Sequence, residues 1–209
     1  SLVLADLRRQ RQRRLTRNAG VNASGAISPA GARFAFAMGR DNQVVLYVMT
    51  IADRGLKRLT RGDAVESSPC WSPDGRRLCF VSDAGGRPQV YAMNAGGGPK
   101  RRVLAQPVET VSPDWREGPY GICFSMRKAG QYVIATADLT QGPKGEARIV
   151  IDKPGDWESP SWAPDGRHIV CTREEANRRE IHIVDTRSGR STQITEPARI
   201  SLPSWSDRL

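Results

Sequence analysis

The sequence reads SSPCWSPDGRRLCFVSDAGGRPQVYAMNAGGG at residues 67–98 and SPSWAPDGRHIVCTREEANRREIHIVDTRSG at residues 159–189. Both stretches begin with a short apolar segment that ends in Trp. A Pro-Asp-Gly turn and two segments of alternating polarity then follow in the same order. Two copies of this length within one chain predict an array of repeated structural units.

Tryptophan marks each unit at nearly constant spacing. Trp71, Trp115, Trp162 and Trp205 are separated by 44, 47 and 43 residues. Counting back 44 residues from Trp71 reaches Ile27, which directly precedes the turn-like sequence SPAG. A period in the low forties is typical of a four-stranded propeller blade.

The unit at 61–104 contains four runs of strand length: SSPCW, RRLCFVS, QVYAMNA and KRRVL. SPDG separates the first two runs as a tight turn, because Pro presets φ, Asp bonds to nearby backbone and Gly accepts a positive φ. No helical period of useful length is present. A four-stranded sheet of this size cannot bury its own faces, whereas stacking such sheets around an axis buries them.

We therefore predict an all-β protein with a single β-propeller domain over residues 1–209. Four complete antiparallel blades are expected at 17–60, 61–104, 105–151 and 152–195. The opening segments LVLADL and RQRRLT match a third and a fourth strand, and ISLPSW (200–205) matches a first strand. A fifth blade is therefore predicted to be shared between residues 1–16 and 196–209, which would protect the edge strands. This blade lacks a second strand, and we expect further residues upstream.

The formal net charge is +10, and residues 1–17 carry six arginines against one aspartate. This pattern has two interpretations, a patch for an acidic partner or nucleic acid, and an arginine-rich solvated surface. Nucleic-acid binding is disfavoured because no aromatic residues are interleaved with the basic run. No apolar run is long enough to span a bilayer, and no signal peptide is recognisable in these residues.

The four cysteines are predicted to be unpaired structural thiols. Cys79 and Cys123 occupy the strand position that holds Ala35 and Val170 in the other units, which is a small apolar site. No Cys-x-x-Cys pair is present, which argues against a structural zinc site. No cofactor or metal is predicted.

Several segments resemble the repeats of the TolB family, the periplasmic component of the bacterial Tol–Pal system. The most specific are SDAGGRPQVY (82–91) and the closing PSWSDRL (203–209), with LADL…RRLT (4–16) and YVMT…KRLT (47–60) in support. The resemblance covers nearly the whole chain. It implies a periplasmic, non-catalytic propeller that binds the peptidoglycan-associated lipoprotein Pal in cell-envelope integrity and division.

The sequence departs from the family pattern in two ways. The family has six blades, and five first strands are counted here. The family also has an N-terminal α/β domain and a segment that engages TolA, and nothing in this chain matches them. Binding to TolA is therefore not expected.

Partner binding is predicted on one face of the propeller. Two kinds of loop lie on this face: those that connect a fourth strand to the next first strand, and those that connect a second strand to a third. The entrance to the central channel is on the same face. Loops on a rigid scaffold often carry function. Trp157 is expected in the loop DKPGDWE, where an exposed aromatic residue is a candidate contact. The predicted contacts are Arg61, Asp63, Glu66, Asp83, Arg87, Asp156, Trp157, Glu158 and Arg173.

No catalytic constellation is recognised. His168 and His182 are candidates for cross-strand neighbours, but the repeat places no cluster of Asp, Glu or Cys beside them. No G-x-S-x-G sequence is present. Trp71, Trp115, Trp162 and Trp205 are expected in the core between blades.

Two alternatives stay open, since a fold does not fix a function. One is the regulatory propeller of a serine peptidase. The other is a propeller that binds or cleaves carbohydrate, which a metal ion in the channel would favour.

Overall fold

The computed structural model describes residues 3–6, 11–14, 22–40, 43–139, 145–196 and 202–205. In these residues every element of regular structure is a β-strand, and eighteen strands are present. The predicted all-β fold is confirmed. No helix in the described ranges has the length and hydrophobicity needed to cross a membrane.

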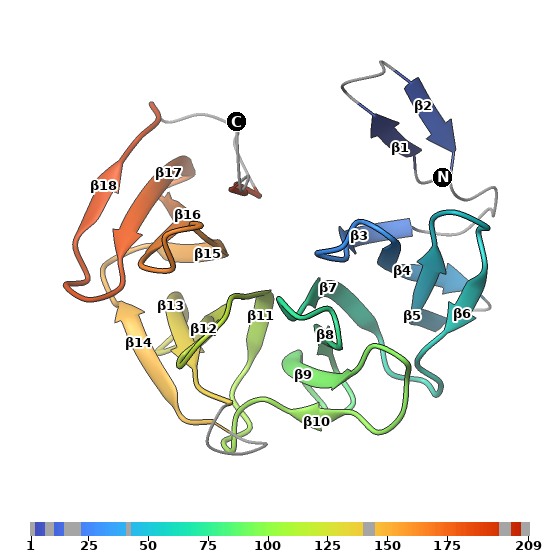
Figure 1. Ribbon diagram of the computed structural model, residues 1–209. Coiled ribbons are helices and arrows are strands. Elements are labelled where there is room, and N and C mark those ends of the chain that lie inside the picture. Colours follow the sequence, from blue (N-terminus) through green and yellow to red (C-terminus); the bar gives the residue numbers. More distant parts are fainter. Residues whose placement is uncertain are drawn as a thin grey trace.

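Sixteen of the strands form four antiparallel sheets of four strands each, which confirms the four predicted blades. Figure 1 shows the sheets arranged around a common axis with the first strand of each innermost. The first and second blades contain β3 (Asn22–Ile27), β4 (Arg33–Arg40), β5 (Gln43–Thr50), β6 (Leu56–Arg58), β7 (Glu66–Trp71), β8 (Arg77–Ser82), β9 (Gln89–Asn94) and β10 (Arg101–Arg102). The third and fourth contain β11 (Thr110–Trp115), β12 (Ile122–Lys128), β13 (Gln131–Ala137), β14 (Ala147–Ile151), β15 (Asp156–Trp162), β16 (His168–Glu175), β17 (Arg178–Asp185) and β18 (Ser191–Gln193).

The SPDG segment forms the turn that its residues predict. The Gly75 amide donates to the Ser72 carbonyl at 2.8 Å, and the Arg77 amide donates to the Ser72 hydroxyl at 2.8 Å. Gly75 has a φ of 66°, which a residue without a side chain adopts at little cost. The turns after β3 and β15 repeat this geometry at Gly31 and Gly166, with φ of 70° and 64°.

Each first strand contains a bulge that the sequence pattern did not predict. The pairing register shifts at one serine per blade, and all four serines have a positive φ, between 37° and 53°. They are Ser24, Ser68, Ser112 and Ser159. In the last three blades a proline follows, which cannot donate to the strand ladder. The Ser68 amide donates to the Ser24 hydroxyl at 3.0 Å, so the bulges also link neighbouring blades.

Apolar side chains fill the space between successive blades. Leu46 and Val48 of β5 belong to one buried cluster with Leu78 and Phe80 of β8. Similar clusters join the second blade to the third and the third to the fourth. This burial stabilises the stacked blades, because no single sheet can cover its own faces.

An arginine covers the anchoring tryptophan at each of three blade interfaces. The guanidinium carbons of Arg33, Arg77 and Arg116 lie 4.6, 4.7 and 4.4 Å from the ring centroids of Trp71, Trp115 and Trp162. These distances allow cation–π attraction. The predicted core position is confirmed for Trp71 and Trp162, whereas Trp115 is half-buried and Trp205 is 38% exposed.

All four cysteines are free and buried, as predicted. Cys70 and Cys79 lie opposite each other in β7 and β8. A hydrogen bond with Cys79, together with burial, raises the pKa of Cys70 well above its usual range. Burial alone raises the pKa of Cys171 to about 12.

We expect these thiols to be unreactive in the folded protein, because the thiolate is the reactive species. At pH 8, an aromatic disulfide reagent should label on average less than about one thiol per native chain within minutes. After denaturation, the same reagent should label all four thiols. Rapid labelling of two or more thiols in a folded sample would contradict their burial.

The fifth, shared blade stays a prediction. The strands β1 (Val3–Asp6) and β2 (Arg11–Arg14) form a separate two-stranded sheet, and Leu202–Trp205 contains no strand. Leu202 nevertheless has a φ of 57° before a proline, like the bulged serines of the complete blades. The rest of the terminal segments, including residues 15–21 and most of the closing PSWSDRL, lies outside the described residues.

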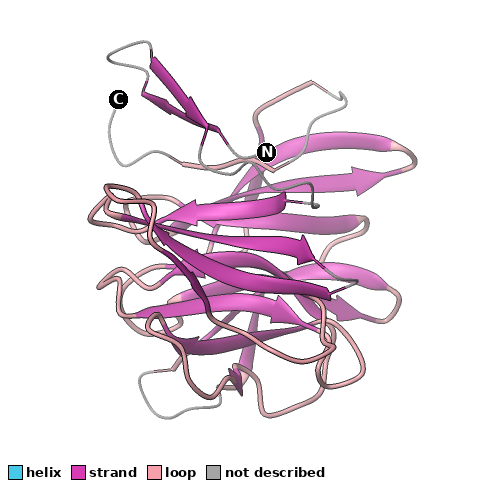
Figure 2. Cartoon of the chain, turned by 90° about the vertical axis from the view of Figure 1, so that its right-hand side faces the viewer, coloured by secondary structure: helices cyan, strands magenta, loops and turns pink. Residues whose placement is uncertain are grey.

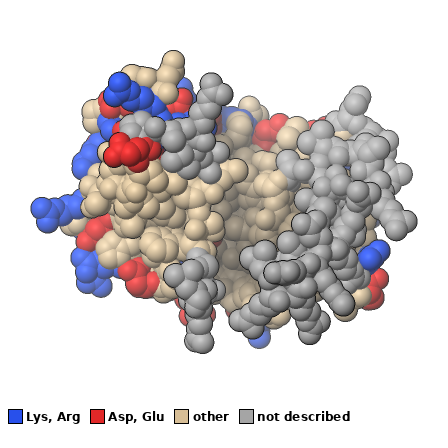
Figure 3. Space-filling model, turned by 90° about the horizontal axis from the view of Figure 1, so that it is seen from above, with Lys and Arg blue, Asp and Glu red and all other residues tan. Residues whose placement is uncertain are grey.

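The fourth blade has a mainly uncharged face on the side that points away from the third blade. Figure 3 looks onto this side and shows charged side chains gathered at the two ends of that blade. Val170 and Thr172 are buried there, and Ile181 and Ile183 are half-buried. The corresponding face of β5 packs against the next blade, so this surface is suited to receive a fifth one.

Candidate functional site

The strands divide the loops into two sets at opposite ends of the blades. Figure 2 shows the loops collected at these two ends. In the second blade, Glu66 begins β7 and Trp71 ends it. At about 3.3 Å per residue, six strand residues separate the two ends by about 17 Å. We call the end with loops 61–65 and 83–88 the entrance face, and the end with the SPDG-type turns the turn face.

The predicted contacts all lie toward the entrance face, but their exposure differs. Arg61, Asp63 and Arg87 are exposed loop residues. Asp83 is half-buried, and its carboxylate accepts a hydrogen bond from the Val65 amide at 2.8 Å. This hydrogen bond connects the loop before β7 to the loop after β8. It restrains the backbone of the loops that carry Arg61, Asp63 and Arg87.

The expected loop position of Trp157 is wrong. Trp157 is the second residue of β15 and is 1% exposed. Its indole Nε1 donates to the Lys153 carbonyl at 3.1 Å, and its ring meets the His182 ring edge-on at 5.0 Å between centroids. Trp157 is buried although the residues next to it in the sequence are polar, because burying the large apolar surface of an indole is strongly favourable.

Glu66 is also a strand residue rather than a loop contact, and it is 1% exposed. Lys100 donates to its carboxylate at 2.6 Å and to the Ser82 hydroxyl at 3.0 Å. Burial raises the pKa of Glu66, and the Lys100 ammonium opposes that shift. An unpaired carboxylate would be costly at this depth, so the ion pair accounts for its place in the core.

A buried polar row runs across the second blade at this level. Glu66 pairs with Ser82, and Ser82 pairs with Gln89 on β9. Gln89 is 2% exposed, and among the described residues neither the oxygen nor the nitrogen of its amide has a hydrogen-bond partner. The first and third blades have Met–Val pairs where this blade has Ser82 and Gln89. The row is therefore a departure of the second blade from the repeat.

Three further predicted contacts are strand residues held by neighbours. Asp156 accepts a hydrogen bond from the Tyr132 amide at 2.8 Å. Arg173 donates from Nε to the Pro154 carbonyl at 3.0 Å. Burial, followed by the charge of Asp156, raises the pKa of Glu158. All three side chains are half-buried, so the entrance side of the fourth blade is a mixed, ordered charged surface.

Sequence reasoning missed the turn face, which contains a cavity of about 680 Å³ around the axis. Trp71, Trp115, Trp162 and Trp205 all line it, and none of the nine predicted contacts does. The Asp114 carboxylate accepts hydrogen bonds from the Trp115 and Trp162 amides at 2.9 and 2.8 Å, which joins the third and fourth blades. The anchoring tryptophans recur before each turn, and this spacing was the signal that could have located the cavity.

The two histidines are not cross-strand neighbours. His168 lies opposite Asp185, and its Nδ1 is 2.5 Å from an Asp165 carboxylate oxygen. His182 lies opposite Cys171 and contacts Glu180 through Nε2 at 3.1 Å. Within the described part of the chain, no group of three His, Cys, Asp or Glu residues is placed to hold a metal ion.

Comparison with known proteins identifies similar chains. The family model for the TolB beta-propeller domain matches residues 1–209. The crystal structure of TolB from Acinetobacter baumannii is 25% identical with a TM-score of 0.81, covering 97% of this chain and 50% of that one. A putative TolB from Agrobacterium tumefaciens is 19% identical with a TM-score of 0.75, covering 92% of this chain and 68% of that one. The chain thus spans half the length of the first relative.

A peptidase also shares the architecture. A puromycin-hydrolyzing peptidase from Mycobacterium tuberculosis is 19% identical with a TM-score of 0.68, covering 87% of this chain and 30% of that one. At this identity the likeness concerns the fold alone.

Proposed function

The chain belongs to the TolB beta-propeller domain family, and from this we propose that it is a non-catalytic scaffold that docks a peptidoglycan-associated lipoprotein on its entrance face. The proposal includes the periplasm as its location and cell-envelope integrity and division as its role. The observation that carries it is the family match over residues 1–209. Binding to TolA is not part of the proposal.

The entrance face has properties that suit protein recognition. Arg61, Asp63 and Arg87 offer exposed charges of both signs, which favour partner selection and rapid association. The Asp83–Val65 hydrogen bond orders the loops before a partner arrives, which reduces the entropy lost on binding. Arg173 is similarly fixed by the Pro154 carbonyl.

Charge reversal provides the test. We expect Arg61→Glu combined with Arg87→Glu to weaken binding of the lipoprotein's periplasmic domain about tenfold, mainly through slower association. Surface plasmon resonance at two salt concentrations would measure the rates. Because both side chains are exposed, the free energy of unfolding should change by less than about 0.5 kcal/mol.

Arg54→Glu combined with Arg76→Glu is the matched control, because it changes the net charge by the same amount and both arginines are exposed on the turn face. It should leave the association rate close to that of the unchanged chain. Equal weakening by both variants would indicate a nonspecific effect of net charge. An entrance-face variant that binds normally would refute the choice of face.

A further inference from the structure

Arg77 lies between two cavities on the turn side of the interface between the second and third blades. One cavity of about 350 Å³ is bounded by Arg77, Trp115, Arg116 and Glu117. The other, of about 270 Å³, is bounded by Arg77, Met93 and Arg101. Arg77 and Leu139 line both, so the two cavities form one groove across the blade interface.

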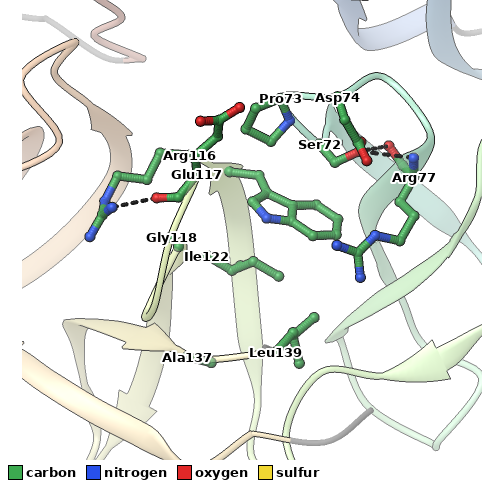
Figure 4. A pocket seen from close by; sticks show the side chains of 12 residues that line it. Ser72, Pro73, Asp74, Arg77, Arg116, Glu117, Gly118, Ile122, Ala137 and Leu139 are labelled. Atoms are coloured by element: carbon green, nitrogen blue, oxygen red, sulfur yellow. Dashed lines mark hydrogen bonds between the residues drawn. The ribbon is translucent and has the colours of Figure 1, made fainter. Parts of the chain in front are cut away.

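The groove combines an apolar floor with charged walls. Figure 4 shows Ile122, Ala137 and Leu139 below, with Arg77 on one side and Arg116 and Glu117 on the other. Ile122 and Ala137 are almost completely buried beneath it. Apolar surface with a few fixed polar groups is the usual composition of a ligand-binding site.

Arg77 differs from Arg33 and Arg116, the two other arginines that cover an anchoring tryptophan. Arg33 donates to the Gly75 carbonyl at 2.6 Å, and Arg116 donates to the Glu117 and Pro119 carbonyls. Among the described residues, no group accepts a hydrogen bond from the Arg77 guanidinium, and no carboxylate forms an ion pair with it. Stacking on Trp115 therefore orients a planar set of donors, although the charge of Arg77 also acts on the nearby Asp74 carboxylate.

The charges around the groove favour an acidic ligand. Arg101 and Arg116 form no ion pair with any described carboxylate, and burial lowers the pKa of Arg116. Two acidic residues line the groove, Asp74 and Glu117. The Asp74 carboxylate already accepts hydrogen bonds from the Ser72 hydroxyl and the Arg76 amide. A net charge of +10 adds a long-range attraction for acidic partners.

We propose that this groove binds an extended peptide segment of a protein partner, with an acidic residue paired to Arg77 and an apolar residue in each cavity. The acidic residue and the two apolar ones would occupy alternate positions, because alternate side chains of an extended chain share one side, about 6.6 Å apart. A guanidinium fork matches a carboxylate in a bidentate pair. The groove lies at the opposite end of the blades from the entrance face, so it is a separate site.

The test is NMR titration of the whole chain with a short acetylated and amidated peptide of the pattern Leu-Ala-Glu-Ala-Leu. The indole N–H resonance of Trp115 should shift and saturate at millimolar peptide. The same peptide with Gln in place of Glu should bind the unchanged chain at least about tenfold more weakly, because it lacks the charge-assisted pair.

Variants of Arg77 locate the effect. Arg77→Met should reduce affinity for the Glu peptide at least about tenfold, and Arg77→Lys should have an intermediate effect, since it keeps the charge without the fork. Arg76→Met is the matched control and should bind normally. The proposal is overturned if Trp115 does not shift, if the Glu and Gln peptides bind equally, or if folded Arg77→Met binds normally. The comparison of the two peptides needs no variant, so it decides even if Arg77→Met does not fold.

Discussion

Trp157→Ala is expected to lower the free energy of unfolding by about 3–5 kcal/mol, the usual cost of removing a buried aromatic side chain. Trp157 lies in the cluster between the third and fourth blades, with Ile134 and Ile151 of the third and Ile169 of the fourth. Truncation would leave a cavity at this interface and remove the hydrogen bond to the Lys153 carbonyl. Thermal denaturation should show a midpoint lower by about 10 °C for a chain of this size.

Two controls accompany this variant. Trp157→Phe keeps most of the apolar contact and should lose less stability than the alanine variant. Tyr120→Ala should lose less than about 1 kcal/mol, because Tyr120 is one of the exposed aromatic residues. If Trp157→Ala were as stable as the unchanged chain and instead lost partner binding, Trp157 would be a surface contact after all.

Lys100→Met is expected to lower the free energy of unfolding by about 3–5 kcal/mol at pH 7, because it leaves the buried Glu66 carboxylate without its cation. The double variant Glu66→Gln with Lys100→Met should recover most of this loss, since neither charge then remains buried. Chemical denaturation of the four chains forms a double-mutant cycle that measures the coupling between the two residues.

The pH dependence of this loss follows from the direction of the Glu66 shift. Its folded-state pKa is raised above the unfolded value, so the folded chain holds the proton more tightly. The contribution of Glu66 to folding stability is therefore largest at pH values below the pKa of Glu66 in the unfolded chain. It decreases as the pH rises through the higher pKa of Glu66 in the folded chain. Without Lys100 the pKa of Glu66 rises further. The Lys100→Met variant should therefore be almost as stable as the unchanged chain in acid, and the full loss of stability should appear at neutral pH.

The exposed pair of Lys128 and Asp152 supplies the control for this cycle. Both side chains are nearly half exposed, and Lys128→Met should change stability by less than about 0.5 kcal/mol. A Lys100→Met loss that is equal at pH 4 and pH 7 would show that Lys100 acts through the packing of its aliphatic chain.

The parts of the fold that depend on local chemistry could be predicted from the sequence. Pro, Asp and Gly fix the turn at 72–75, and alternating polarity identifies strands such as RLCFVS. The bulged serines could not be predicted, because their positive φ accompanies a register shift between the first and second strands of each blade, and Ser68 also bonds to Ser24 of the preceding blade. A Ser-Pro sequence alone does not specify that conformation.

The site was predicted less well, because loop boundaries were read from polarity. Glu66 and Trp157 both stand five residues before an anchoring tryptophan, a position that is already within the first strand. Counting back from Trp71 and Trp162 would have placed both residues in strands. Their burial depends on partners distant in sequence, Lys100 for one and His182 for the other.

Isothermal titration of the chain with the periplasmic domain of its own organism's peptidoglycan-associated lipoprotein tests the proposed function most directly. We expect saturable one-to-one binding with a Kd of about micromolar or lower. The Arg61→Glu and Arg87→Glu double variant should bind more weakly, and the Arg54→Glu and Arg76→Glu double variant should bind normally. Absence of heat at several temperatures from a folded, monomeric sample, with no change in amide hydrogen exchange on the entrance face, would contradict the scaffold function.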